Sequence, residues 1–252
     1  MIPHSFSAET PLIDPVSADP STSRAVEHTS RRRTIQSFVL RQGRLTQAQA
    51  RALEILEPVY GLSADQRVDA VATFGRTAPL IVEIGFGNGE SLATMAAASP
   101  ESDFIGMEVH RPGVGHLLLQ IESLGLSNVR VHRGDAVHFL RECLPDTSIQ
   151  RLQIFFPDPW HKKKHHKRRL INPDFALLAA RKLCAGGLLH VATDWQHYAE
   201  HILDVLDAEP AFVNQAGEQR FVERPSHRPL TKFEQRGQRL GHGVWDILYQ
   251  RL

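Results

Sequence analysis

The pattern of apolar and polar positions changes at about residue 80 of the chain. From there on, short apolar runs alternate with segments in which apolar residues recur every three to four positions. The short runs predict strands and the periodic segments predict helices. Strands are expected at about 80–85, 103–109, 129–132, 149–156 and 188–193, and helices at about 89–98, 111–124, 136–143 and 173–183. This alternation predicts a doubly wound α/β fold on a mainly parallel sheet.

Both ends of the chain depart from this alternation. Residues 1–30 are rich in Ser, Thr, Pro and acidic residues, so a disordered tail is expected there. The folded domain is expected over residues 31–252, beginning with a basic and helical extension in which Thr46 caps a helix. The run VWDILYQRL, residues 244–252, predicts a strand with no helix after it, which would close the sheet in antiparallel orientation. The loop before it, at about 220–241, has a length that is usually functional or disordered.

Composition limits the class of protein. The 252 residues are 42% hydrophobic and carry a formal net charge of +1, so any affinity for nucleic acid must come from local clusters of charge. The two cysteines have neither metal-type nor disulfide-type spacing, which favours a reducing compartment. No apolar run is long enough to cross a bilayer, and the N-terminal residues do not resemble a signal peptide. We therefore expect a cytoplasmic protein with no membrane partner.

A glycine-rich turn follows the first predicted strand. Glu83 begins the pattern E-x-G-x-G-x-G, which continues through Gly85, Gly87 and Gly89. Glycine lets a backbone turn tightly and approach a ligand closely. A dinucleotide fingerprint would need its third glycine where this chain has Glu90. The acids would also repel a pyrophosphate, whereas S-adenosylmethionine carries a sulfonium and an ammonium and no phosphate, so an acidic rim suits it.

Two further acids close the next two predicted strands. Glu108 lies about twenty residues after the glycines, where a carboxylate can accept hydrogen bonds from both hydroxyls of a ribose. Asp135 follows the third strand, at a place suited to adenine. The alternative is that these residues are turn acids and helix caps. One acid after each of the first three strands favours S-adenosylmethionine as the cofactor.

The fourth predicted strand runs into FPDPWHKKKHHKRR, residues 156–169. Asp158 lies between two prolines, which stiffen the loop, at the same edge of the sheet as the other acids. In S-adenosylmethionine enzymes of this architecture the reacting nitrogen of the substrate lies here, so Asp158 is the candidate catalytic residue. A structural turn anchored by Trp160 is the alternative. The cations that follow predict contacts with RNA phosphates, with a solvated surface as the alternative.

Two histidine patterns raise the question of a metal site. His197, Glu200 and His201 spell H-x-x-E-H, the order found in one class of zinc protease. The pattern is short, and it follows the fifth strand of a sheet already assigned to another ligand. The three histidines of the basic run have six cationic neighbours, which oppose a divalent metal. We therefore expect no metal.

Together these blocks resemble the bacterial tRNA (guanine-N7-)-methyltransferases. The resemblance spans about residue 31 to the C-terminus, and it is carried by E-x-G-x-G with Glu108 and Asp135, FPDPWHKKKHHKRR, Thr193-Asp194-Trp195, RPLTKFEQRG (228–237) and GHGVWDI (241–247). It implies a Rossmann-like class I methyltransferase fold with seven strands. It also implies methyl transfer from S-adenosylmethionine to N7 of a guanine in the variable loop of tRNA.

The resemblance implies roles for individual residues as well. Cofactor contacts fall on Glu83, Glu108, Asp135 and Asp158, beside Gly85 and Gly87. Substrate contacts fall on Lys162, Asp194, Thr231, Lys232, Phe233 and Glu234. RNA contacts fall on Lys164, His165, His166, Lys167, Arg168 and Arg169. Beyond tRNA, no obligatory protein partner is expected.

The chemistry of the implied reaction assigns most of the catalysis to positioning. Guanine N7 carries a lone pair and no proton, so its attack on a sulfonium needs no general base, and alignment of the reacting atoms can supply several kcal/mol. Asp158 and Asp194 are candidates to stabilise the cationic base or to accept its N–H groups. Three rival functions are methyl transfer to an exocyclic base amine of RNA, a Rossmann-type oxidoreductase, and an RNA-binding module without catalysis.

Overall fold

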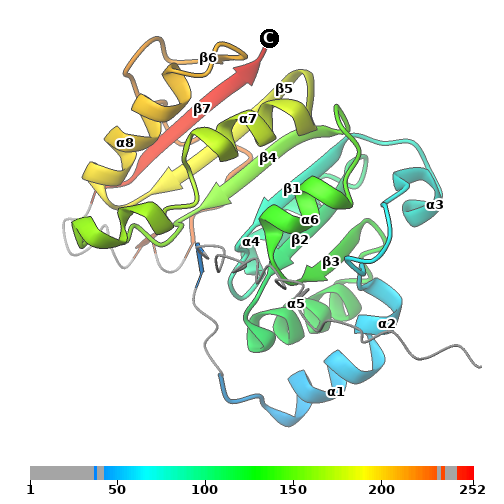
Figure 1. Ribbon diagram of the computed structural model, residues 1–252. Helices are drawn as coiled ribbons and strands as arrows, with labels where there is room; N and C mark the ends of the chain where they lie inside the picture. Colours follow the sequence, from blue (N-terminus) through cyan, green and yellow to red (C-terminus); the bar gives the residue numbers. More distant parts are fainter. Residues whose placement is uncertain (1–36, 39–42, 232–233, 236–242) are drawn as a thin grey trace, which may run out of the picture. The chain divides into compact units, whose positions relative to one another are not determined.

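The fold is built on one sheet of seven strands in the order β3-β2-β1-β4-β5-β7-β6 (Figure 1). The structure is a computed structural model and describes residues 37–38, 43–231, 234–235 and 243–252. The strands are β1 (Leu80–Ile84), β2 (Asp103–Glu108), β3 (Val129–Arg133), β4 (Ile149–Phe155), β5 (Leu183–Thr193), β6 (Phe212–Asn214) and β7 (Trp245–Arg251). Strands β1 to β5 pair in parallel, and β7 runs antiparallel to β5 and β6. The predicted doubly wound, mainly parallel sheet with an antiparallel closing strand is confirmed.

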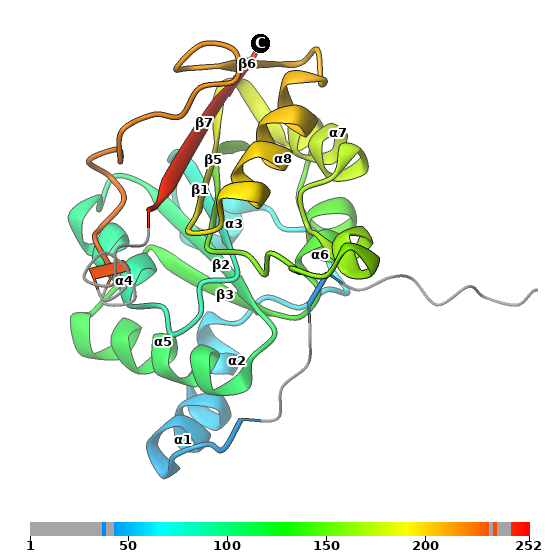
Figure 2. The same cartoon turned by 90° about the vertical axis from the view of Figure 1, so that its left-hand side faces the viewer.

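Helices cover both faces of this sheet (Figure 2). One face carries α4 (Glu90–Ala98) and α5 (Arg111–Leu124), and the other carries α6 (Ala136–Glu142), α7 (Pro173–Lys182) and α8 (Gln196–Asp207). Before the sheet come α1 (Gln47–Ile55), α2 (Glu57–Tyr60) and α3 (Ala70–Phe74). The predicted cap of the first helix is confirmed, because Thr46 and Gln49 form a capping box at the start of α1. A 3-10 helix, η1 (Lys163–Arg168), follows β4.

The central strands are buried on both faces of the sheet, and alternate residues of each strand pack on opposite faces. All five residues of β1 are buried. Val82 and Ile84 pack with the helices α6 to α8, and Ile81 packs with α4 and α5. Because side chains alternate along a strand, Glu83 shares the face of Ile81.

The structure adds two features to the predicted strands. Strand β5 begins at Leu183 and not, as predicted, at residue 188. Its first residues include Gly186, which suggests a turn in the sequence but lies within the strand with a φ of +74°. The pairing of β4 with β5 shifts register between Ile149 and Arg151, as expected of a β-bulge. Strand β6, with three residues, is too short to show a periodic pattern.

The predicted tail and the arginines that follow it lie outside the described residues, as do Lys232 and Phe233 in the C-terminal loop. Within the described ranges, no helix has the length and apolar character needed to cross a membrane.

Candidate active site

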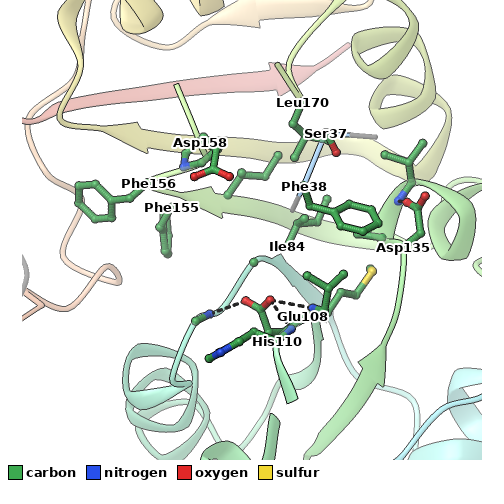
Figure 3. A pocket seen from close by; sticks show the side chains of 18 of the residues that line it. Ser37, Phe38, Ile84, Glu108, His110, Asp135, Phe155, Phe156, Asp158 and Leu170 are labelled. Atoms are coloured by element: carbon green, nitrogen blue, oxygen red, sulfur yellow. Dashed lines mark hydrogen bonds between the residues drawn. The ribbon is translucent and has the colours of Figure 1, made fainter. Parts of the chain in front are cut away.

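A pocket of about 480 Å³ lies where β1, β2, β3 and β4 end (Figure 3). Ligands of open α/β sheets bind at this edge, and the volume is that of a small-molecule site. Polar side chains reach it from the loops after the strands, with Glu108 on the β2 side and Asp158 on the β4 side. Its apolar walls include Ile84, Met107, Ile154, Phe155 and Phe38.

The glycine turn has the backbone that its sequence predicts. Gly85, Gly87 and Gly89 have φ angles of +74°, +62° and +79°, in the left-handed region that side chains disfavour. Gly85 and Gly87 line the pocket. A Cβ at Gly113 of α5 would lie 1.9 Å from the Gly87 carbonyl oxygen, so the turn packs closely on that helix. Helix α5 thus supports one side of the turn, and the other side faces the pocket.

Glu108 joins the two loops that border the pocket. Its Oε2 accepts a hydrogen bond from the Gly87 N–H at 3.0 Å, and its Oε1 accepts from Val109 and His110 at 2.7 and 2.9 Å (Figure 3). A carboxylate offers about four lone pairs. Three are engaged by the backbone, so one acceptor position on Oε2 remains for a ligand hydroxyl, and the contact with both ribose hydroxyls stays a prediction.

Asp135 is both a helix cap and a residue that lines the pocket. Its Oδ1 caps α6 by accepting from Val137 N–H at 2.9 Å and His138 N–H at 3.3 Å. The residue also lines the pocket. Among the described residues no hydrogen-bond donor reaches its Oδ2. One oxygen therefore fixes the side chain, and the other is available to a ligand.

Glu83 lies on the opposite face of β1 from the pocket. Its Oε2 accepts a hydrogen bond at 2.8 Å from Gln153, its direct neighbour on β4. Burial raises the pKa of Glu83 to about 7, against the opposing effects of the Gln153 hydrogen bond and the charge of Arg151. The pocket is lined by Ile84 and not by Glu83. The Glu83 side chain therefore supports the strand beneath the glycine turn, and its contact with the cofactor stays a prediction.

The loop that carries Asp158 is flanked by two residues in a strained conformation. Phe156 and Trp160 have φ angles of +55° and +48°, which are uncommon for residues with side chains. The Phe156 N–H donates to the carbonyl of Ala192 at 2.7 Å. Asp158 itself is exposed at the pocket edge. No described residue forms a hydrogen bond or ion pair with its carboxylate, which leaves it open to a substrate.

Trp160 anchors the loop, as the alternative interpretation of the sequence proposes. Its indole Nε1–H donates to the carbonyl of Ser37 at 3.2 Å. The guanidinium carbon of Arg168 lies 3.8 Å from the centre of the Trp160 ring, and Arg168 also donates to the carbonyl of Phe38 at 3.2 Å. A segment early in the chain is thereby attached to the loop after β4.

The basic run divides into an exposed and an internal set. The exposed cations are Lys162, Lys163, Lys164 and Lys167. Arg169 is only 2% exposed; its Nε–H donates to the Pro159 carbonyl at 3.0 Å and its Nη2 lies 3.3 Å from His197 Nδ1. Slight desolvation and the surrounding cations lower the pKa of His165, which favours its uncharged form. His166 Nε2 lies 3.4 Å from the His161 carbonyl oxygen. The Arg169 guanidinium is therefore buried against the loop that it holds, and its contact with RNA stays a prediction.

The H-x-x-E-H segment on α8 does not assemble a metal site. His197 faces Arg169, and Glu200 accepts a hydrogen bond from Gln196 at 3.0 Å. His201 Nε2 donates to the Ile171 carbonyl at 3.1 Å. Across the described ranges, no three His, Cys, Asp or Glu side chains converge as metal ligands would.

Of the predicted substrate residues outside the basic run, Asp194 is half-buried and Glu234 is buried. Asp194 is half-buried after β5 and does not cap α8, whose N-cap residue is Trp195. The hydroxyl of Thr231 accepts from the Glu234 N–H at 3.1 Å. The Glu234 carboxylate is buried and accepts from Arg228 at 2.6 and 2.9 Å. The carboxylate is thus turned inward, away from solvent.

Sequence analysis did not single out Arg228, Ser37 or Phe38. Arg228 belongs to the RPLTKFEQRG block, where a basic residue among polar neighbours suggests a surface. Ser37 and Phe38 lie more than a hundred residues from the loop they contact, and no local pattern reports such a contact.

The strand order and the pocket beside a glycine turn with following acids define a Rossmann-like class I methyltransferase. The crystal structure of the 16S rRNA methyltransferase KamB matches 74% of this chain and 94% of that chain with a TM-score of 0.53 and 13% sequence identity. The aminoglycoside resistance methyltransferase NpmB1 matches 76% and 94% with a TM-score of 0.50 and 13% identity. At this identity the likeness supports the fold alone.

Sequence comparison narrows the class to a family. The sequence signature of the family described as "Putative methyltransferase" matches residues 77–247. The chain is 55% identical to the tRNA (guanine-N(7)-)-methyltransferase of Alcanivorax borkumensis, over 92% of this chain and 95% of that protein. It is 59% identical to the protein of the same name from Methylococcus capsulatus, over 87% and 95% respectively. The chain belongs to the bacterial tRNA (guanine-N7-)-methyltransferase family, and the resemblance found in its sequence is confirmed.

Proposed function

We propose that this protein transfers a methyl group from S-adenosylmethionine to N7 of a guanine in the variable loop of tRNA. The observation that carries the proposal is the position of Asp158, an exposed carboxylate between the pocket and the exposed lysines of η1. The relatives in Alcanivorax and Methylococcus are named for this reaction, which supports the same substrate here. A tRNA substrate also supports a location in the cytoplasm.

The residues around the pocket fit S-adenosylmethionine. Among the described lining residues there is no Lys or Arg, which disfavours a pyrophosphate-bearing dinucleotide. Glu108 Oε2 and Asp135 Oδ2 retain acceptor capacity for hydroxyl and amine groups. When bound, S-adenosylmethionine supplies an electrophilic methyl group on a sulfonium.

Asp158 is suited to hold guanine and to balance its charge. The free carboxylate can accept hydrogen bonds from the N1–H and the exocyclic amine of the base, which would fix N7 toward the pocket. Methylation at N7 makes the base cationic, and a carboxylate aimed at that charge lowers the barrier. Asp194, after the neighbouring strand, is proposed to assist as a second acceptor. Pro157 and Pro159 restrict the loop, so less ordering is needed at the moment of reaction.

The exposed lysines are proposed to hold the RNA. Contacts with phosphates orient a nucleic acid without reading its sequence. Lys162 lies nearest to Asp158 along the chain and is proposed to contact the target nucleotide, with Lys164 and Lys167 on neighbouring phosphates. The anionic RNA would otherwise be repelled by Asp158, so cations beside the acid compensate for that repulsion.

One experiment tests the function directly. The protein is incubated with labelled S-adenosylmethionine and unmodified tRNA transcript, and the modified nucleoside is identified. The expected product is N7-methylguanosine, which is recognised by its lability to alkali. A methyl group on an exocyclic amine would favour the rival base position, and retention of tRNA without methyl transfer would favour a binding module.

A second experiment tests the proposed cofactor contact. The Glu108→Gln variant should bind S-adenosylhomocysteine about 10- to 100-fold more weakly, because hydrogen bonds to a charged group contribute roughly 1.5 to 3 kcal/mol. Calorimetry measures the dissociation constant. The Glu122→Gln variant, on the exposed side of α5, serves as the matched control and should bind normally. Equal affinities for all three proteins would remove Glu108 from the cofactor site.

A further inference from the structure

Arg228 is buried with four hydrogen bonds to two carboxylates. Its side chain is 1% exposed. Towards Glu234 its Nη1 and Nη2 donate at 2.6 and 2.9 Å, and towards Asp246 its Nε and Nη2 each donate at 2.7 Å. Fully buried arginines are rare, and a guanidinium with two bidentate partners has a strictly limited orientation. This arginine is therefore a fixed point between the C-terminal loop and β7.

Two histidines extend the cluster from Asp246. His190 Nε2 lies 2.8 Å from Asp246 Oδ1, and His190 Nδ1 lies 3.0 Å from His227 Nε2. A carboxylate only accepts, so His190 Nε2 carries the hydrogen, His190 Nδ1 accepts, and His227 Nε2 donates. Burial lowers the pKa of His190, and burial together with Arg151 lowers the pKa of His227 to about 3. These shifts favour neutral rings, so Arg228 is the cation that pairs with both Asp246 and Glu234.

The same guanidinium faces the strand that leads to Asp158. Its carbon lies 5.8 Å from the ring centres of Phe155 and of Phe156, the left-handed residue two positions before Asp158. The backbone gives a second link: Asp246 pairs with Ala192 across the sheet, and the Ala192 carbonyl accepts the Phe156 N–H. Arg228 thus contacts both the start of the Asp158 loop and Glu234 of the C-terminal loop.

We propose that Arg228 is a positioning residue, which holds the Asp158 loop and Glu234 at a fixed separation for the guanine. A left-handed conformation at Phe156 persists only when its surroundings enforce it, and the Arg228 guanidinium 5.8 Å from its ring centre is one such constraint. Glu234 then fixes the orientation of the Arg228 guanidinium through its two hydrogen bonds. This inference rests on the proposed function, because the distance being held matters only if a base enters between the two segments.

The test replaces Arg228 by a residue that keeps the charge and lacks the planar guanidinium. In Arg228→Lys, the methyl-transfer rate in a single turnover at saturating tRNA and S-adenosylmethionine should fall about 100-fold, the effect of a misplacement of roughly 1 Å. The dissociation constant of S-adenosylhomocysteine should stay within a factor of about two, because the glycine turn and Glu108 are unchanged. The rate is expressed per cofactor-bound molecule, so partial unfolding cannot lower it.

The matched control is Arg130→Lys. Arg130 also packs on aromatic rings, with its guanidinium carbon 4.9 Å from the Phe74 ring centre, and also donates to fixed acceptors, including the Thr73 carbonyl at 2.8 Å. It lies at the start of β3, away from the edge that carries the pocket. Its single-turnover rate per cofactor-bound molecule should equal that of the wild type.

A second variant keeps the test decisive if Arg228→Lys does not fold. Glu234→Gln preserves shape and weakens the pair with Arg228, so its single-turnover rate should also fall while cofactor affinity holds. The inference is overturned if whichever variant folds reacts within a factor of about two of the wild type. Absence of methyl transfer by the wild-type protein would instead overturn the proposed function, so the two failures are distinguishable.

Discussion

At the level of single residues, the loop from Phe156 to Trp160 sets an exposed acid between two left-handed residues. Each such residue costs on the order of 1 kcal/mol or more, and the surrounding structure must compensate. Contacts from Arg228 to Phe156 and from Arg168 to Trp160 provide that compensation at the two ends. The position of Asp158 is thereby fixed before any ligand binds.

The Asp158→Asn variant tests the charge of this residue. The turnover number should fall by roughly 100- to 1,000-fold, because the amide keeps the shape of the side chain and removes the charge that balances the methylated base. Affinity for tRNA should persist, because the exposed lysines of η1 are proposed to hold it. Steady-state kinetics and filter binding measure these quantities, with Asp204→Asn on the exposed face of α8 as the control. Full turnover by Asp158→Asn would remove this residue from the mechanism.

The sequence predicts which acids lie at the ends of strands, but not which face of the sheet a buried side chain lies on or which cations are buried. Glu108, Asp135 and Asp158 follow strands, and the end of a strand is a local feature that apolar runs reveal. The face of Glu83 could not be predicted in the same way, because β1 is buried on both sides and shows no alternation. The burial of Arg169 depends on a contact with α8, which lies about thirty residues away in the chain.

At the level of elements, η1 converts a basic run into a surface with two sides. A 3-10 helix brings every third residue to the same side. The lysines lie outward, whereas Arg168 and Arg169 turn toward Trp160 and Tyr198, with the Arg169 guanidinium carbon 4.8 Å from the Tyr198 ring centre. Composition revealed the charge of this run but not which cations remain exposed.

Neutralising the exposed lysines of η1 should weaken tRNA binding without altering the active site. In a Lys163→Gln, Lys164→Gln, Lys167→Gln variant, the slope of log affinity against log salt concentration should decrease by roughly 0.7 to 0.9 for each phosphate that the variant no longer binds. The weakening should be uniform across tRNA sequences, since phosphates carry no sequence information. Binding is measured over a salt series.

Arg181→Gln provides the control for this series. Arg181 is exposed on α7, beside the opposite end of β5 from the pocket, and pairs with Asp146 at 3.1 Å. Its salt dependence should match that of the wild type. If the lysine variant also kept the wild-type slope, η1 would not contact phosphates.

At the level of the whole molecule, polar residues form a row across one face of the sheet. Glu83 pairs with Gln153, Gln153 pairs with His190, and His190 bonds to Asp246 on β7. Burial shifts the two ends of the row in opposite directions: the pKa of Glu83 is raised and that of His190 is lowered. Both shifts favour the neutral form of the buried group, and both make stability depend on pH.

The Glu83→Gln variant tests the acidic end of the row. With a pKa of about 7 in the folded state and 4.5 as its usual value, Glu83 binds more protons folded than unfolded between these pH values. Its contribution to the unfolding free energy is therefore full below pH 4.5 and is lost as the pH rises to about 7. The neutral side chain removes this loss, so the variant should gain up to roughly 3 kcal/mol relative to the wild type between pH 4.5 and pH 8.

Urea unfolding at both pH values measures the gain. The groups that face Glu83 are Gln153, Arg151 and Glu108, and none of them changes in the variant. The exposed Glu122→Gln variant should show the same pH dependence as the wild type. A wild-type difference between the two pH values that persists in Glu83→Gln would show that another group causes it.

The exposure of the lysines in and beside η1 also makes their amines accessible to amine-selective reagents. The chain has six lysines, and Lys162, Lys163, Lys164 and Lys167 are four of them. Lys182 is 3% exposed and pairs with Asp146 at 2.7 Å, so acylation there is hindered. Mild acylation followed by mass spectrometry therefore labels the proposed tRNA surface with little background in the described fold. Protection of these four amines by added tRNA would map the docked RNA without any substitution in the protein.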